Sequence, residues 1–262
     1  MGLFDGRVAL VSGVGPGLGR SVAVQLAEHG ADLVLAARRE KRLAKVAAEV
    51  EALGRRVLCV PTDITDPASC AALADATGEA FGRLDILVNN AFTDGTFARF
   101  DEADLATWKQ TMDVNLWGTL QLTQQMIPLL RQATDGDGRI VMVNTMSVQK
   151  IEERFGGYAA SKAALATAAK TLAVELGPFG IRVNSVHPGY IYGPSVEWYF
   201  NHLAEQEGRT FQEIYDERAD ETCLRYLPPA DEIAGAVLFL ASPWAKAVTG
   251  QAVNVNAGHW IG

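Results

Sequence analysis

Short apolar runs alternate with longer amphipathic segments along the whole chain. Each apolar run is short enough for a buried strand of a parallel sheet, in which both faces of the strand are covered. The predicted strands are 8–11, 32–37, 57–60, 84–91, 139–144, 181–186 and 252–255. The segments between them have helical spacing, and most of them end at glycine or proline. The predicted helices are 20–29, 40–53, 67–81, 101–130, 158–176 and 229–241.

The alternation of strands and helices predicts a single α/β domain, built on a doubly wound parallel sheet with helices on both faces. In such a fold, ligands bind outside the carboxyl ends of the strands. The residues that follow each predicted strand are therefore the first candidates for a functional site.

A glycine-rich turn lies between the first predicted strand and the first helix. Glycines allow a backbone to approach a pyrophosphate closely, and the helix N-terminus favours its charge. The spacing differs from Gly-x-Gly-x-x-Gly, because Leu18 stands at the third glycine position. We favour a nucleotide site over an ordinary tight turn. The turn reads Ser12-Gly13-Val14-Gly15-Pro16-Gly17-Leu18-Gly19.

The second predicted strand ends in Ala37-Arg38-Arg39, without a carboxylate. A carboxylate at this place binds a ribose diol, as for NAD, whereas an arginine accepts a 2′-phosphate. The sequence therefore predicts NADP, with Arg38 as the main phosphate contact and Arg39 beside it, and NAD stays possible. The alternative is that both arginines only begin the next helix. After the third strand, Asp63 and Ile64 are placed to meet the adenine.

A run of small residues that favours a helix begins at Tyr158 and ends at the stop signal Gly177-Pro178. We expect Gly156-Gly157 to be a flexible lead-in. Residues four apart share one face of a helix, so the Tyr158 phenol and the Lys162 ammonium can point into one pocket. A nearby cation lowers the pKa of a phenol from about 10, which predicts a general acid–base pair. A surface tyrosine beside a solvated lysine is the alternative.

Further polar residues lie close to the same predicted edge of the sheet. The hydroxyls of Thr145 and Ser147 follow the fifth strand, where one can bond a substrate oxygen beside Tyr158. Asn115 lies on the long predicted helix, where a buried amide needs hydrogen-bond partners. It is either a structural residue or the holder of a water molecule near the site.

Composition and charge exclude several classes of function. The net charge is −8, and the Lys and Arg residues are scattered, which argues against a nucleic-acid partner. The three cysteines have no metal-type spacing, so we predict no metal site and expect reduced thiols in the cytoplasm. The sequence shows no signal-peptide pattern and no apolar run near the roughly 20 residues of a membrane span, so we expect no membrane partner.

Taken together and in order, these motifs resemble the classical short-chain dehydrogenase/reductase (SDR) family over nearly the whole chain. Three departures stand out. Gly193-Pro194-Ser195 stands where members often have a threonine that holds the nicotinamide amide, which leaves that contact to the Ile191 backbone or to Ser195. Phe92 replaces the glycine that follows Asn-Asn-Ala in the family, and the family's catalytic serine position falls on Thr145. Ser147 is the alternate if the following loop is shorter than usual. The segments that carry the resemblance are 12–19, Asn89-Asn90-Ala91, Asn115, Tyr158-x-x-x-Lys162 and Pro188-Gly189.

The resemblance implies one Rossmann-type SDR domain over 1–262 and NAD(P)-dependent interconversion of a secondary alcohol and a ketone. Tyr158 would then exchange the proton, and Lys162 would bind the nicotinamide ribose. Thr145 or Ser147 would orient the substrate oxygen, and Asn115 would hold a water. The implied cofactor-binding residues are Gly13, Gly15, Pro16, Gly17, Leu18, Gly19, Arg38, Arg39, Asp63, Ile64, Asn90, Ala91, Tyr158, Lys162, Pro188, Gly189 and Ile191.

The resemblance also implies that an insertion at about 190–227 closes over the substrate as a lid. Its aromatic residues, with Phe92 and Phe97, predict a bulky hydrophobic, alicyclic or steroid-like alcohol or ketone. Packing of these aromatics within the lid itself is the alternative. A 3-oxoacyl thioester reductase and a non-catalytic nucleotide-binding scaffold are the other functions to weigh, although the acidic lid disfavours an acyl carrier. Members of the family suggest a homotetramer or homodimer.

Overall fold

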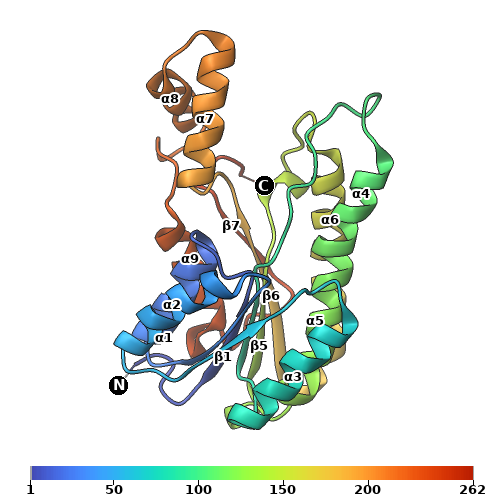
Figure 1. The fold of residues 1–262 in the computed structure, drawn as a ribbon, viewed down its shortest axis with the longest axis vertical. Coiled ribbons are helices and arrows are strands. Elements are labelled where there is room, and N and C mark those ends of the chain that lie inside the picture. The colour runs from blue at the N-terminus through green and yellow to red at the C-terminus, as the bar shows by residue number, and fades with distance from the viewer. Residues whose placement is uncertain (1, 262) are drawn as a thin grey trace.

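The computed structural model describes residues 2–261. Its centre is a sheet of seven parallel strands in the order β3-β2-β1-β4-β5-β6-β7 (Figure 1). β1 pairs with both β2 and β4, so the strand order reverses there. The strands are β1 (Val8–Ser12), β2 (Asp32–Ala37), β3 (Val57–Pro61), β4 (Ile86–Asn89), β5 (Gly138–Val143), β6 (Ile181–Pro188) and β7 (Ala252–Val255).

Helices cover both faces of this sheet, as Figure 1 shows. α1 (Leu18–Glu28), α2 (Glu40–Ala52) and α9 (Ala230–Ala241) lie on one face. The other face carries α3 (Pro67–Phe81), α4 (Leu105–Met112), α5 (Thr119–Leu130) and α6 (Gly156–Leu176). The predicted fold class, a doubly wound α/β sheet of Rossmann type, is confirmed.

Neighbouring residues of β1 enter two different hydrophobic cores. Val8 and Leu10 pack with α3, α5 and α6, whereas Ala9 and Val11 pack with α1, α2 and α9. Successive side chains of a strand point to opposite faces, so a strand covered on both faces is apolar throughout. This double packing holds the carboxyl ends of the strands, and the loops that follow them, in fixed positions.

The helix predicted at 101–130 is divided into three parts. It begins only at Leu105, where the carboxylate of Asp104 accepts a hydrogen bond from the backbone N–H of Ala106 at 2.9 Å. Between α4 and α5, residues Asp113–Gly118 form a π-helical segment that contains Asn115. Single π-helical turns within α-helices often mark functional sites, because they redirect side chains.

The expectation that Gly156-Gly157 is a flexible lead-in is wrong, because both residues are the first turn of α6. The indole of Trp108 on α4 occupies the space that their side chains would need. A Cβ atom added at Gly156 would lie 2.5 Å from this indole, and one at Gly157 would lie 2.9 Å from it. Glycine therefore allows α4 and α6 to approach closely, directly before Tyr158.

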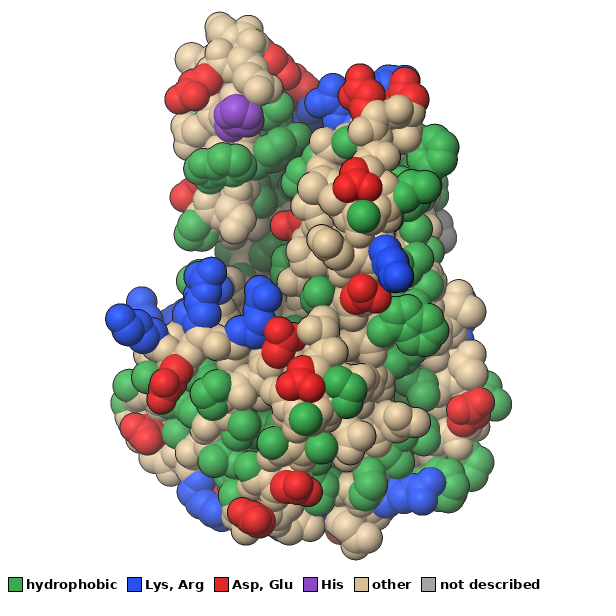
Figure 2. Space-filling model, turned by 45° about the vertical axis from the view of Figure 1, so that its right-hand side comes forward, with side chains coloured by type: hydrophobic (Ala, Val, Ile, Leu, Met, Phe, Trp, Pro, Cys, Tyr) green, Lys and Arg blue, Asp and Glu red, His purple; other side chains and the backbone are tan. Residues whose placement is uncertain are grey.

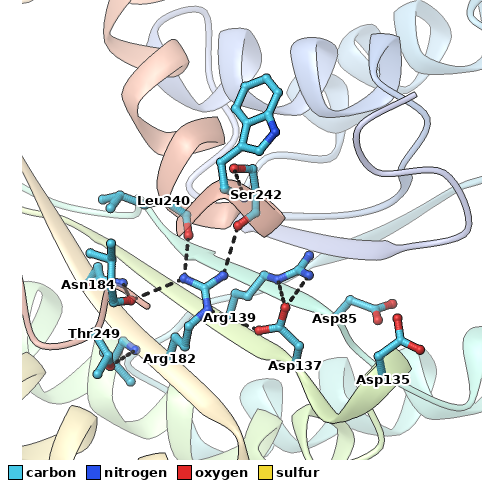
Figure 3. Close-up of polar contacts among 12 residues, drawn as sticks. Asp85, Asp135, Asp137, Arg139, Arg182, Asn184, Leu240, Ser242 and Thr249 are labelled. Carbon is cyan, nitrogen blue, oxygen red and sulfur yellow. Dashed lines mark hydrogen bonds and ion pairs between the residues drawn. The ribbon is translucent and has the colours of Figure 1, made fainter. Parts of the chain in front are cut away.

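A network of buried charges closes the amino ends of β5 and β6 (Figure 3). Asp137 accepts hydrogen bonds from Arg139 at 2.7 Å and from Arg182 at 3.1 Å. Arg182 also donates to the backbone carbonyls of Leu240 and Ser242, at 3.1 and 3.2 Å. These two arginines are almost completely buried, so each depends on such partners.

The segment predicted as a lid contains α7 (Pro194–Glu207) and α8 (Phe211–Asp220), which stand beyond the carboxyl end of the sheet (Figure 1). It has a small hydrophobic core of its own, formed by Phe200, Ile214 and Leu227 with Phe211 and Tyr215 packed against them. Most lid aromatics therefore pack within the lid, as the alternative interpretation stated. Among residues 2–261, the structure contains no helix long and apolar enough to cross a membrane.

Candidate active site

The glycine-rich turn lies against the end of β4, at the point where the strand order reverses. The side-chain amide of Asn90 donates to the carbonyl of Gly13 at 2.9 Å. The Ser12 hydroxyl accepts from the backbone N–H groups of Asn90 and Ala91, at 3.2 and 3.3 Å. Gly13 has a φ of +74°, and a Cβ atom there would lie 2.5 Å from the Cα of Ala91. Only glycine fits this contact, which brings two predicted cofactor segments together.

The same turn leads into the N-terminus of α1, which begins at Leu18. Gly17 precedes it with open space where a Cβ atom would be, whereas a Cβ atom at Gly19 would lie 2.6 Å from the Gly13 carbonyl oxygen. Leu18 is buried in the core, which explains why a large residue replaces the third glycine of the usual spacing. An open backbone at a helix N-terminus fits a pyrophosphate. Gly15 and Pro16 lie in the same turn.

Unpaired arginines lie at the end of β2, where the cofactor phosphate was predicted. Arg38 and Arg39 are exposed, and within residues 2–261 no hydrogen bond or ion pair engages either guanidinium. Arg42, which the sequence analysis did not single out, places a guanidinium nitrogen 3.8 Å from the Cβ position of Gly15. Figure 2 shows basic side chains gathered below the lid on this side. These residues fit a 2′-phosphate, and no carboxylate ends β2 to hold a free diol.

Asp63 lies after β3, where the adenine was predicted. Its carboxylate accepts hydrogen bonds from the backbone N–H and the hydroxyl of Thr65, at 3.0 and 2.7 Å. These bonds, with a smaller effect of the Arg38 charge, lower the pKa of Asp63. Ile64, the next residue, is buried. Asp63 is therefore ionised and within the electrostatic reach of Arg38.

Lys162 is buried against the end of β5. Its ammonium donates to the carbonyl of Val143 at 2.9 Å, and its own carbonyl accepts from the amide of Asn144 at 3.1 Å. Burial lowers the pKa of Lys162 from 10.5 to about 8, and the negative charge of Asp94 opposes this shift. The lysine is thus fixed against the end of the sheet. Its lowered pKa means that its ammonium releases a proton more readily than that of an exposed lysine.

The expectation that Lys162 lowers the pKa of Tyr158 is wrong for this structure. Burial raises the pKa of the Tyr158 phenol well above 10, and the negative charge of Asp94 raises it further. A hydrogen bond with the Thr145 side chain acts in the opposite direction. Desolvation dominates, because the phenolate would lose water without gaining an equally close cation. Without bound molecules, Tyr158 is therefore a protonated phenol.

Both candidate hydroxyls lie at the carboxyl end of β5, and they contact each other. Thr145 Oγ1 donates to Ser147 Oγ at 3.2 Å and accepts from the Ser147 backbone N–H at 3.2 Å. Thr145 is the one whose side chain acts on Tyr158. The structure thus brings Thr145, Tyr158 and Lys162 together, and Ser147 is hydrogen-bonded to Thr145.

Asn115 joins the π-helical segment to the loop after β4. Its carboxamide accepts from the backbone N–H of Thr93 at 2.8 Å and donates to the Thr93 carbonyl at 2.9 Å. It also donates to the Ser161 hydroxyl at 3.0 Å. All of its side-chain bonds are therefore structural in this state. The predicted role of Asn115 in holding a water stays a prediction.

The remaining predicted cofactor residues lie at the end of β6. Pro188 is the last residue of this strand, and Gly189 follows it. A Cβ atom at Gly189 would lie 3.0 Å from Asn256 and 3.2 Å from the sulfur of Met146, so the turn is closely packed. Ile191 packs against the core on the α9 side. Among residues 2–261, the structure contains no group of three metal-ligating side chains.

Aromatic rings line the approach to Tyr158. The ring of Phe92 lies 6.4 Å from that of Tyr158, and the Lys162 ammonium lies 5.7 Å from the centre of the same ring. Phe155 lies 6.5 Å from Tyr158 on another side and 4.7 Å from Phe97. We call Phe92, Phe97 and Phe155 the aromatic wall. Phe92 and Phe97 are half-exposed, so the wall is open to a bound molecule.

Comparison with known proteins places this arrangement in a family. A family model described as Enoyl-(Acyl carrier protein) reductase matches residues 13–259. Short chain dehydrogenase/reductase astE from Aspergillus oryzae is 35% identical over 261 residues, which cover 97% of this chain and 95% of that protein. The chain belongs to the short-chain dehydrogenase/reductase family.

Solved structures of family members have the same fold. Carveol dehydrogenase from Mycobacterium avium, in complex with NAD, has a TM-score of 0.91 at 29% identity and covers 99% of both chains. L-sorbose reductase from Gluconobacter frateurii, complexed with NADPH and L-sorbose, has a TM-score of 0.92 at 30% identity, covering 99% of this chain and 98% of that one. This SDR chain is accordingly an NAD(P)-dependent oxidoreductase that acts on CH–OH groups.

Two residues at the site of this SDR escaped the sequence analysis. Asp94 follows the Asn-Asn-Ala segment at the end of β4, and its charge acts on both Tyr158 and Lys162. Arg42 lies beside Gly15. A signal for Asp94 was present, because a carboxylate in a loop after a central strand is placed near any ligand. Arg42 gave no such signal, because it sits within a mixed-charge helix.

Proposed function

We propose that this SDR interconverts a secondary alcohol and a ketone on a bulky, largely apolar, alicyclic or steroid-like molecule, with NADP as the preferred cofactor. The observation that carries the substrate proposal is the aromatic wall. The rings of Phe92 and Phe155 lie beside Tyr158, and Phe92 replaces a residue that has no side chain in the family motif. Burial of an apolar ring on such a surface contributes about 25 cal/mol per Å². The name of carveol dehydrogenase, whose substrate is an alicyclic alcohol, agrees with this class.

In this proposal, Tyr158 gives its proton to the carbonyl oxygen during reduction. Its raised pKa keeps the phenol protonated, as a proton donor must be. The Thr145 hydroxyl holds the same oxygen in place, and the Lys162 ammonium supplies positive charge below it. The nicotinamide, when bound, supplies the hydride. In oxidation, the proton moves from the alcohol back to Tyr158.

The cofactor would be held by the glycine-rich turn and the end of β2. The helix N-terminus at Gly17 fits the pyrophosphate, and Arg38 with Arg39 and Arg42 fits the 2′-phosphate. We expect Arg38→Ala to weaken NADPH binding by about 10- to 100-fold and NADH binding little, since a charge-assisted hydrogen bond contributes about 1.5–3 kcal/mol. Lys41→Ala, an exposed change in the first turn of α2, is the control. Wild-type preference for NADH would contradict the NADP proposal.

The substrate proposal is tested by cofactor consumption with four carbonyl classes: alicyclic ketones, steroid ketones, ketose sugars and 3-oxoacyl thioesters. We expect the highest kcat/KM among the first two classes. Phe92→Gly, which restores the family residue, should lower kcat/KM for these ketones by about 10-fold and leave small ketones unaffected. Fastest turnover of the thioester would favour an acyl reductase. Tight cofactor binding without any turnover would favour a scaffold role.

A further inference from the structure

Asp94 is held at the catalytic centre by the residues on both sides of it. Its neighbour Thr93 is fixed by two hydrogen bonds with Asn115, at 2.8 and 2.9 Å. On the other side, Gly95 has a φ of +73° and packs so closely on Thr111 that no side chain fits there. The Gly95 N–H also donates to the Thr93 hydroxyl at 3.4 Å. The backbone of Asp94 is thus positioned by the π-helical segment and by α4.

The carboxylate of Asp94 acts directly on the catalytic pair. Its negative charge is the largest electrostatic influence on Tyr158 and on Lys162 after burial itself. Phe92, two residues earlier in the same loop, contacts both of these side chains. The loop after β4 therefore places a phenyl ring beside Tyr158 and Lys162, and a carboxylate close enough for its charge to act on both.

Asp94 has no partner of its own within the described chain. Across residues 2–261, no hydrogen bond or ion pair engages its carboxylate, although Asp101 and Glu153 nearby both pair with Arg99. The residue has an exposed surface, so a bound molecule can reach it, while desolvation by the surrounding chain raises the pKa of its carboxyl and the Lys162 charge opposes this shift. An unpaired carboxylate in such a position accepts hydrogen bonds from hydroxyl groups.

We propose that Asp94 is a specificity-determining residue that accepts a hydrogen bond from a second hydroxyl group of the substrate, close to the reacting carbon. The substrate is then a hydroxylated ring compound: a diol when the enzyme oxidises it, and a hydroxyketone when the enzyme reduces it. Its ring packs on the aromatic wall, and its second hydroxyl lies on Asp94. This inference rests on the proposed alcohol–ketone function and narrows its substrate class.

The test compares 2-hydroxycyclohexanone with cyclohexanone, in wild type and in Asp94→Ala. A hydrogen bond to a charged group contributes about 1.5–3 kcal/mol, so wild type should prefer the hydroxyketone by about 10- to 100-fold in kcat/KM. Asp94→Ala should abolish this preference, so that the kcat/KM values of the two ketones lie within about threefold of each other in this variant. Asp101→Ala, an exposed change in the same loop, is the matched control and should keep the preference.

Three outcomes would overturn the inference: equal wild-type kcat/KM for the two ketones, a preference that survives in Asp94→Ala, or faster turnover of 2-aminocyclohexanone than of the hydroxyketone. Failure of the general function is distinguishable, because neither ketone would then be reduced by wild type, and both proposals would be wrong. Asp94→Asn supplies a second measurement. It removes the charge, so the pKa values of both Tyr158 and Lys162 should fall and the pH–rate profile should move to lower pH.

Discussion

Charged groups lie at both ends of the parallel sheet, but within the described chain they pair with each other at the amino end, whereas Lys162 and Asp94 lack such partners at the carboxyl end. At the amino end, Asp137 lies between Arg139 and Arg182, and each group has hydrogen-bond partners (Figure 3). At the carboxyl end, and among the residues described, the buried Lys162 ammonium has a carbonyl as its one hydrogen-bond partner and the exposed Asp94 carboxylate has none. The first arrangement stabilises the fold, and the second leaves interactions for a ligand to complete.

The pKa shifts show the same difference. At the amino end, burial of Asp137 is outweighed by the hydrogen bonds of the two arginines, which hold the pKa of its carboxyl below the ordinary value. At the carboxyl end, burial dominates: it lowers the pKa of Lys162 to about 8 and raises that of Tyr158. The amino end therefore favours the charged form of Asp137, whereas the carboxyl end disfavours the charged forms of Lys162 and Tyr158.

The largest expected effect is the loss of activity in Tyr158→Phe. General acid catalysis contributes about 10²–10⁴ in rate, so kcat should fall by about a thousandfold. The thermal midpoint should not fall, because only one hydroxyl is removed and the ring stays packed against Phe92. Steady-state kinetics and a melting curve measure both effects. Activity above a tenth of wild type would show that another group transfers the proton.

Asp137→Asn should lower stability and leave turnover nearly unchanged, which is the opposite of the result expected for Tyr158→Phe. It leaves two buried guanidinium groups without their counter-charge, which costs about 3–5 kcal/mol of stability. Denaturant unfolding measures this loss, and turnover per folded molecule should stay near that of wild type. Glu153→Gln, which breaks an exposed ion pair with Arg99, is the control and should change stability little. An unchanged stability in Asp137→Asn would contradict the assignment of the amino end as structural.

Lys162→Met should change how stability depends on pH. Because folding lowers the pKa of Lys162 from 10.5 to about 8, the unfolded state binds more protons than the folded state between these values. The free energy of unfolding should therefore rise with pH from about 8 toward 10.5, by about 3 kcal/mol over the full window. Lys162→Met should remove this rise. The same slope in both proteins would mean that the lysine is not desolvated in solution.

The smallest expected effect distinguishes the two hydroxyls at the end of β5. Thr145→Val removes the hydroxyl that acts on Tyr158 and should lower kcat by about 100-fold, as loss of one hydrogen-bond donor to a reacting oxygen does. Thr145→Ser should restore most of the rate. Ser147→Ala should lower kcat by less than about threefold, because Ser147 bonds to Thr145 and acts on Tyr158 only through it. A larger loss in Ser147→Ala than in Thr145→Val would reverse the assignment.

The fold was predictable because most strands are short, largely apolar runs and most of the predicted helices end at glycine or proline. Tyr158 and Lys162 were also found, since i and i+4 spacing on a helix fixes their relative position. Local spacing could not reveal that Gly156-Gly157 is helical, because the reason is the indole of Trp108 from another helix.

The electrostatics of the site were less predictable than its residues. The sequence suggested a cation lowering the pKa of Tyr158, but burial and the charge of Asp94 raise it. Both effects depend on how deeply the groups are packed, which spacing along the chain does not report. The lid shows the same limit, because its aromatic residues are compatible with a pocket or with the small core around Phe200 that the structure contains.

The most direct test of the account follows a deuterium atom. Wild type and Tyr158→Phe are each incubated with a cyclic ketone and NADPH that carries deuterium at C4, on one face or the other, and the product is analysed by mass spectrometry. We predict that wild type transfers deuterium to the carbinol carbon from one face only, and that Tyr158→Phe binds the cofactor but transfers almost none. Equal transfer by both proteins, or product without deuterium from either face, would contradict a hydride transfer assisted by Tyr158.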